Sequence, residues 1–245
     1  MKLHDVAIIL VETTHDGNVG ATARAMGNMG FSDLRLVNPR QAPGAEAYAR
    51  ASGADWILDK ATHHASLADA VADRRLVIGT TARRRESAWQ VFSPKEIASQ
   101  AALVYADHAA AIVFGRESSG LSNRELDLCD SLVSIPVDQA FSSLNVASAV
   151  MVICYELRVA LEAGTKPVAK TSADNLPATA AARENFFDHL QETLSALSFV
   201  KVSEPEKLMR KIRHLYMKAA PSTEEVSILR GILASITESI DKKKD

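Results

Sequence analysis

The chain has 245 residues, of which 47% are hydrophobic and 24% charged, a composition typical of a folded protein with a sizeable core. Its formal net charge of −2 excludes binding of nucleic acid through overall basicity, so any basic surface must be local. Its two cysteines, Cys129 and Cys154, form no CxxC or Cys/His cluster, which argues against a disulfide framework and a structural zinc site.

The chain begins with an apolar run at residues 6–11. This run is too short to cross a membrane and carries no cleavage pattern of a signal peptide. It predicts a buried β-strand in a cytoplasmic protein that has no membrane partner.

Short apolar runs rich in Val and Ile alternate with helical patterns over residues 1–164. They predict strands at residues 6–11, 34–37, 76–78, 111–114 and 132–137. Helices are predicted at residues 18–29, 94–105, 123–129 and 143–162. Two helix starts have the spacing of a capping box, at Ser93 with Glu96 and at Ser122 with Glu125. The alternation predicts an α/β fold in which a mostly parallel sheet carries helices on both faces.

The remainder of the chain predicts a linker and a small helical C-terminal extension. Residues 165–179 contain two prolines and little apolar content, as linkers do. Residues 180–245 then show helical patterns at 180–198, 205–219 and 223–240. In the second of these, Leu208, Ile212 and Leu215 form an apolar stripe, while lysines and arginines fall on other faces. That basic side suits RNA binding and simple exposure to solvent equally well.

Four polar loops follow predicted strands, at the sheet edge where α/β proteins build their sites. The first, residues 12–20, opens a helix that carries Arg24, and Asn18 with Gly20 suits a tight turn whose free N–H groups bind an anion. The second loop ends in a compact basic patch made of Arg83, Arg84 and Arg85. For each of these arginines, an exposed side chain without a partner is the competing interpretation.

The third and fourth loops contain glycines and hydroxyl groups. Residues 114–121 match the first half of a phosphate-binding P-loop, but Leu121 stands where the P-loop lysine is required, so binding of a nucleoside triphosphate is not expected. Glycines in this position also let the backbone approach a flat ligand such as adenine. In the fourth loop, Ser142, Ser143 and Asn145 precede the longest helix, and simple N-capping competes with a binding role for either serine.

Taken in order, these segments resemble the three motifs of the SPOUT class of RNA ribose methyltransferases, and within that class the TrmJ-like branch. Residues 18–25, NVGATARA, resemble the first motif. Residues 112–117, IVFGRE, together with Gly120 and Leu121, resemble the second. Residues 142–149, SSLNVASA, resemble the third. The resemblance covers residues 1–164 in the family's order, and the helical extension is similar to that of the bacterial branch.

The resemblance implies a trefoil-knotted sheet and a homodimer with active sites at the subunit interface. It also implies transfer of a methyl group from S-adenosyl-L-methionine (SAM), without a metal, to a ribose 2′-hydroxyl of tRNA, at nucleotide 32 of the anticodon loop (C or U). The implied SAM pocket consists of Thr80, Thr81, Ala82, Gly115, Ile135, Ser142, Ser143 and Leu144.

Arg24 falls on the family's catalytic arginine. The implied contacts with tRNA are Asn18, Arg83, Arg84, Arg85, Glu117 and Asn145. Three alternatives stay open: an rRNA ribose methyltransferase, a non-catalytic RNA- or SAM-binding protein on the same fold, and an unrelated nucleotide-binding α/β protein. The absence of a GxGxxG sequence counts against the last of these.

Overall fold

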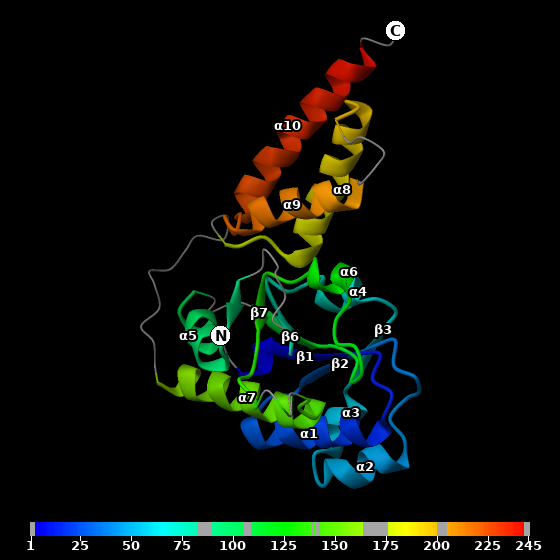
Figure 1. Ribbon diagram of the computed structural model, residues 1–245, viewed down its shortest axis with the longest axis vertical. Helices are drawn as coiled ribbons and strands as arrows, with labels where there is room; N and C mark the ends of the chain where they lie inside the picture. The colour runs from blue at the N-terminus through cyan, green and yellow to red at the C-terminus, as the bar shows by residue number, and fades with distance from the viewer. Residues whose placement is uncertain are drawn as a thin grey trace. The chain divides into compact units, whose positions relative to one another are not determined.

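The computed structural model describes residues 3–82, 90–104, 109–138, 140, 143–163, 176–199 and 205–242 (Figure 1). The chain forms two compact units, Met1–Ala169 and Lys170–Asp245. Most of the predicted linker, residues 165–175, lies outside the described ranges, so its boundaries stay a prediction. Within those ranges, no helix combines the length and the apolar character that crossing a bilayer requires.

The first unit is built on a seven-stranded sheet in the order β3-β2-β1-β6-β4-β7-β5, and all pairings between these strands are parallel. The central strand β1 is buried along its whole length, as expected for a parallel strand covered on both faces. Its Ile8 pairs with Leu34 on one side and with Ile112 on the other. The strands are β1 (Val6–Val11), β2 (Asp33–Val37), β3 (Thr62–His64), β4 (Leu76–Thr80), β5 (Val91–Phe92), β6 (Ala110–Phe114) and β7 (Ser131–Val133).

Helices cover both faces of this sheet, which confirms the predicted α/β architecture. Helix α7 packs against both α1 and α5, and Figure 1 shows α1 and α7 on one side of the sheet with α4 and α6 on the other. The chain starts with the 3-10 turn η1 (Leu3–Asp5). The α-helices are α1 (Asp16–Met29), α2 (Ala45–Ala51), α3 (Asp55–Asp59), α4 (Leu67–Val71), α5 (Pro94–Val104), α6 (Asn123–Leu126) and α7 (Val146–Glu162).

Several elements were not predicted because they are too short to show a periodic pattern of apolar residues. Helices α3 and α4 have five residues each, and the edge strand β3 is largely exposed. Strand β7 ends at Val133 rather than at the predicted residue 137, because its neighbour β5 ends at Phe92, whose carbonyl accepts the N–H of Ser134 at 2.9 Å. Helix α6 ends at Leu126 rather than at Cys129, whose N–H bonds back only three residues to the Leu126 carbonyl.

The second unit contains the three predicted helices, α8 (Ala180–Ala196), α9 (Pro205–Met217) and α10 (Thr223–Asp241). Their common core consists of Ala178, Phe186, Phe187, Leu190, Met209, Val226 and Leu233. The predicted apolar stripe of α9 is wrong at one end, since Leu215 is 68% exposed. The core side of α9 instead runs through Met209, Ile212 and Tyr216, because Tyr216 packs edge-on against Phe186 with ring centres 5.0 Å apart.

The basic side of α9 is partly used inside the unit. Arg213 pairs with Glu184 and lies over the Phe187 ring, with its guanidinium carbon 4.2 Å from the ring centre. A guanidinium held on one side by a carboxylate and on the other by an aromatic face stabilises the helical unit. Arg213 is therefore a structural residue rather than an open contact for RNA.

Candidate active site

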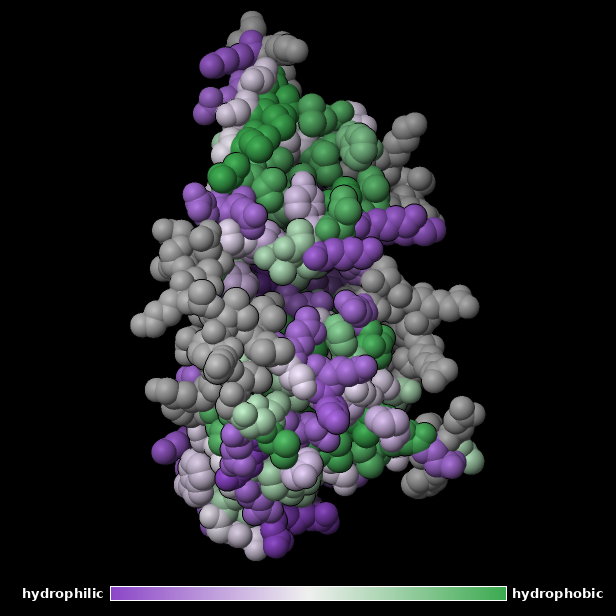
Figure 2. Space-filling view, turned by 90° about the vertical axis from the view of Figure 1, so that its left-hand side faces the viewer, coloured by the Kyte–Doolittle hydropathy of each residue, from purple (hydrophilic) through white to green (hydrophobic). Residues whose placement is uncertain are grey.

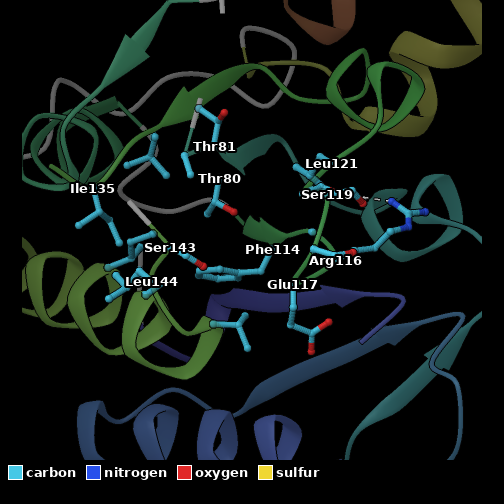
Figure 3. Close-up of a pocket in the computed structure, with 18 of the residues that line it drawn as sticks. Thr80, Thr81, Phe114, Arg116, Glu117, Ser119, Leu121, Ile135, Ser143 and Leu144 are labelled. Carbon is cyan, nitrogen blue, oxygen red and sulfur yellow. Dashed lines mark hydrogen bonds between the residues drawn. The ribbon is translucent and has the colours of Figure 1, made fainter. Parts of the chain in front are cut away.

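A cavity of about 290 Å³ lies at the carboxyl ends of β4, β6 and β7 (Figure 3). Three loops and the start of α7 form its walls, which is the arrangement expected at the carboxyl edge of a parallel sheet. Residues predicted for the SAM pocket that line this cavity are Thr80, Thr81, Ala82, Gly115, Ile135, Ser143 and Leu144. Ser142, also predicted there, lies outside the described residues.

Gly115 is the point at which the loop after β6 folds back on itself. A Cβ atom at this position would lie 2.3 Å from the backbone carbon of Gly120 and 2.4 Å from the nitrogen of Leu121. The loop is closed by the N–H of Gly120, which donates to the carbonyl of Arg116 at 2.8 Å. The sequence suggested that glycine here lets the backbone approach a ligand, and the structure shows that it lets the backbone approach itself.

Three side chains, from the first turn of α1 (Asn18), the loop after β6 (Glu117) and the N-cap of α7 (Asn145), form one chain of hydrogen bonds. The amide of Asn145 donates to Asn18 Oδ1 at 3.0 Å, and the amide of Asn18 donates to Glu117 Oε1 at 3.1 Å. The backbone N–H and the hydroxyl of Thr14 donate to Glu117 Oε2 at 3.4 and 3.3 Å. The structure thus brings together three residues that were predicted to contact RNA, and adds Thr14, which the sequence did not single out.

Asn145 also has a structural task. Its Oδ1 accepts the N–H of Ala147 at 2.9 Å and caps α7, so the cap of this helix is the asparagine and not one of the serines before it. Because the Asn145 side chain both caps α7 and donates to Asn18, it holds the start of α7 next to the start of α1.

Glu117 is an ionised acceptor. Partial burial by itself raises its pKa, but hydrogen bonds from its own backbone N–H, from Asn18 and from Thr14 outweigh that effect and bring the pKa below the usual value. A carboxylate with a lowered pKa is a weak base. Glu117 is therefore suited to orienting the Asn18 amide rather than to removing a proton from a substrate.

Arg116 ties the loop after β6 to two other segments. Its Nε and Nη2 donate to Glu12 at 2.8 and 2.5 Å, and its Nη1 and Nη2 donate to Glu125 at 2.9 and 3.0 Å. Nη1 also donates to the carbonyl of Gly120 at 3.4 Å. These bonds use all of the N–H groups that a guanidinium has, so Arg116 has none left for an RNA phosphate. Glu125 completes the predicted capping box of α6 with Ser122, which joins that helix start to the same cluster.

The acidity of Glu125 gives a testable prediction. Burial raises its pKa, but hydrogen bonds from Arg116 and Ser122 outweigh this and lower the pKa below 4.5, the value without the fold. Because the folded-state pKa is the lower one, the carboxylate stabilises the fold above pH 4.5 and loses that contribution as the pH falls through the folded-state pKa. Glu125→Gln is expected to lower the Tm at pH 7 by about 4 °C, and by less at pH 4.

Thermal unfolding followed by circular dichroism at both pH values measures this difference. The matched control is Glu162→Gln, because Glu162 forms an exposed ion pair with Arg158 within α7 and should leave the Tm unchanged at either pH. An equal loss of Tm for Glu125→Gln at pH 7 and pH 4 would show that its charge contributes nothing.

Arg24 lies on α1 with an exposed side chain and does not line the cavity. It is six residues beyond Asn18, hence about 240° further around the helix axis, and the two side chains leave α1 in different directions. The structure therefore does not bring Arg24 to the cavity of its own chain. The predicted contacts Arg83, Arg84 and Arg85 lie outside the described residues.

Comparison with known proteins identifies the family. A family model described as the SpoU rRNA Methylase family matches residues 5–155. The chain belongs to the SpoU methylase family. A second family model, described as the C-terminal domain of the tRNA methyltransferase TrmJ, matches residues 181–245 of this SpoU methylase.

Relatives of this SpoU methylase match over nearly its whole length. The tRNA (cytidine/uridine-2'-O-)-methyltransferase TrmJ of Yersinia pestis (strain Pestoides F) is 42% identical over 98% of this chain and 94% of its own. The protein of the same name from Sodalis glossinidius is 41% identical, over 96% and 92%. The crystal structure of TrmJ from Z. mobilis ZM4 covers 94% of this chain and 98% of its own, with a TM-score of 0.81 and 32% identity. The predicted membership of the TrmJ-like branch is confirmed.

Proposed function

We propose that this protein transfers a methyl group from SAM to a ribose 2′-hydroxyl of tRNA in the cytoplasm, and that its target is C or U at nucleotide 32. The observation that carries the proposal is the cavity at the carboxyl ends of β4, β6 and β7, whose lining includes Glu117, the end of the hydrogen-bonded chain through Asn18 and Asn145. Family membership supports methyl transfer, and the names of the relatives support a pyrimidine ribose of tRNA. Nucleotide 32 rests on the resemblance of the motifs.

The residues that line the cavity fit SAM. The cavity lining combines apolar side chains such as Phe114, Leu121 and Ile135 with the hydroxyl groups of Thr81 and Ser143. This mixture suits a ligand with a flat base, a ribose and a charged tail, and the volume is near the lower end of the range of about 300–1,000 Å³ typical of small-molecule sites. When bound, SAM supplies a methyl group on a positively charged sulfur, which a hydroxyl oxygen can attack directly.

The protein must position a weakly nucleophilic ribose hydroxyl and stabilise the negative charge that develops as the proton leaves. Glu117 holds the Asn18 amide, and Asn18 in turn holds the Asn145 amide, so the polar groups next to the cavity are oriented before RNA arrives. Arg24 would bind a neighbouring phosphate and stabilise the oxygen anion. Its guanidinium carries five N–H donors and no acceptor for a proton, so it is suited to binding and charge stabilisation rather than to acting as the base.

We further propose a homodimer in which Arg24 completes the site of the second copy. The separation of Arg24 from the cavity of its own chain supports this arrangement. So does α7, which packs beside α1 and exposes Tyr155 and Val159 by 53% and 43%, because apolar side chains one turn apart suit a subunit interface. The trefoil knot is proposed on the resemblance to the SPOUT class.

An rRNA ribose is the second candidate substrate, since the family model that matches residues 5–155 is described as an rRNA methylase family. What favours tRNA is the match of residues 181–245 to the TrmJ C-terminal domain, together with relatives named as tRNA methyltransferases that align over nearly the full chain.

The experiment that tests the proposal is incubation of the protein with SAM and unmodified tRNA transcripts, followed by nucleoside mass spectrometry. A 2′-O-methylated pyrimidine that maps to nucleotide 32 is expected, and a transcript with a 2′-deoxynucleotide at that position should not be methylated. Methylation elsewhere in tRNA would contradict the position alone. Methylation of rRNA fragments but not of tRNA would contradict the substrate, and SAM binding without methylation of either RNA would favour a non-catalytic protein.

A further inference from the structure

Helix α10 has two apolar faces, and the described residues of the second unit cover only one of them. The first face carries Val226, Leu229 and Leu233, which pack into the core of that unit, with α8 as the main neighbour. On the other, Ile228 and Ile232 are 57% and 52% exposed. Figure 2 shows apolar side chains gathered over the C-terminal helices. Because a surface helix usually has a single apolar face, the second one indicates a further contact.

The uncovered face is a narrow stripe along α10. At about 100° per residue, one side of the helix carries Ile228, Gly231, Ile232, Ser235 and Ser239, here called the exposed stripe. It alternates the large side chains of Ile228 and Ile232 with the small ones of Gly231 and Ser235. Such ridges and grooves allow a second helix to pack closely.

Gly231 is an independent sign of a close approach. A Cβ atom built on it meets nothing within 4 Å, so no neighbour among the described residues requires a glycine there. In the middle of a helix, glycine is less favourable than alanine because it loses more backbone freedom on folding. A close helix–helix contact would explain why this position has no side chain.

We propose that the exposed stripe binds the same stripe of a second copy of this chain, with the two α10 helices antiparallel. The charges at the two ends of the stripe favour a second, antiparallel copy as its partner. Glu224 lies at the N-terminal end of the stripe and Lys242 at its C-terminal end. Antiparallel pairing brings Glu224 of each copy to Lys242 of the other, whereas parallel pairing would bring like charges together. The same register sets Gly231 opposite Ser235 of the second copy and leaves Ile232 beside the two-fold axis. Such a contact is self-complementary and closes with two copies.

The pairing of the α10 helices uses different residues from the homodimer interface proposed above, which lies on α1 and α7. It does not depend on the proposed reaction. In a chain that already dimerises through its first unit, contact between the two α10 helices becomes intramolecular, which favours a small interface.

Cysteine cross-linking of the full-length protein tests the pairing. Ile232→Cys introduces a thiol beside the expected axis, and the native Cys129 and Cys154 are both buried, so they contribute little background. The matched control is Ala234→Cys, an exposed position about 200° away around α10. Under mild oxidation, Ile232→Cys is expected to form a covalent dimer at least about tenfold faster than Ala234→Cys, at a rate that dilution does not change. Equal rates for the two variants would overturn the proposal.

Charge reversal tests the antiparallel direction in the Ile232→Cys background. Glu224→Lys is expected to slow cross-linking about fivefold, because two exposed ion pairs become two contacts between like charges. Adding Lys242→Glu to that variant should restore the rate, although each change alone opposes the helix dipole. If the double variant cross-links as slowly as Glu224→Lys, the antiparallel pairing is wrong.

Filling the groove gives a second, steric test. Gly231→Leu is expected to abolish cross-linking through Ile232→Cys while leaving the thermal unfolding of the protein unchanged or raised, since leucine favours the helix more than glycine does. Cross-linking that survives this substitution would show that the two helices do not meet at Gly231.

Discussion

Arg24→Ala is expected to reduce the rate of methyl transfer about 100-fold or more, the effect of losing one charged contact to the transition state. The affinity for SAM should stay near that of the unmodified protein, because the proposed contact of Arg24 is with an RNA phosphate and not with SAM. Single-turnover methylation of a tRNA transcript and equilibrium binding of SAM measure the two quantities separately.

The matched control is Arg50→Ala. Arg50 is an exposed arginine on α2 whose ion pair with Glu46 within the same helix should contribute little. A near-normal rate for Arg24→Ala would remove Arg24 from the mechanism. If Arg50→Ala slowed methyl transfer as strongly, the effect would reflect a general loss of positive charge toward tRNA.

The second large effect is expected from Gly115→Ala, which should weaken SAM binding about 10- to 100-fold. The added methyl group would meet the backbone of Gly120 and Leu121, and forcing atoms into so close a contact costs about 1–3 kcal/mol. Because the clash is with backbone rather than with a flexible side chain, the loop that lines the cavity must move. Isothermal titration of SAM into the purified variant measures the loss.

Gly53→Ala controls for a general loss of stability. Gly53 has a left-handed backbone, with φ of 93°, but its Cβ would meet nothing within 4 Å, and Gly53 is absent from the cavity lining. Its substitution should lower the Tm through backbone strain and leave SAM binding intact. Equal losses of SAM affinity in both variants would show that the shape of the Gly115 loop has no specific role.

The two expected defects also test whether sites are shared between subunits. Arg24→Ala and Gly115→Ala, co-expressed in equal amounts, should give dimers of which about half are mixed, and each mixed dimer has one intact site if Arg24 acts across the interface. Methylation by the mixture should then reach about a quarter of the normal rate. Activity no higher than that of the two variants measured separately would place both residues in one site within one chain.

The sequence predicts the central part of the fold well because β1 and β6 are continuous runs of buried apolar residues. It also predicts which loops meet, since the carboxyl ends of parallel strands share one edge of a sheet. In contrast, the Arg116 cluster was missed because Glu12 is 104 residues away along the chain. The cluster forms because β1 lies next to β6 in the sheet. No local sequence pattern indicates the order of the strands.

The face of α9 illustrates a different limit. Leu208 is followed by Met209, and Leu215 is followed by Tyr216, so the same helical spacing describes two faces that are one residue apart. Only the packing of Tyr216 on Phe186 decides between them. Periodicity therefore predicts that a helix is amphipathic more reliably than which of two adjacent apolar residues is buried.

The strand order also determines when the sheet can form during synthesis. β1 can pair with β2 as soon as residue 37 has left the ribosome, but its other edge pairs with β6, in which Ala111 is the partner of Ala7. At roughly 5–20 residues per second, that edge stays open for several seconds. During this time an uncharged strand, VAIILV, presents unpaired backbone groups, which is the condition that favours aggregation of nascent chains. Until β6 is made, we therefore expect the nascent N-terminal strand to be prone to pairing with other chains.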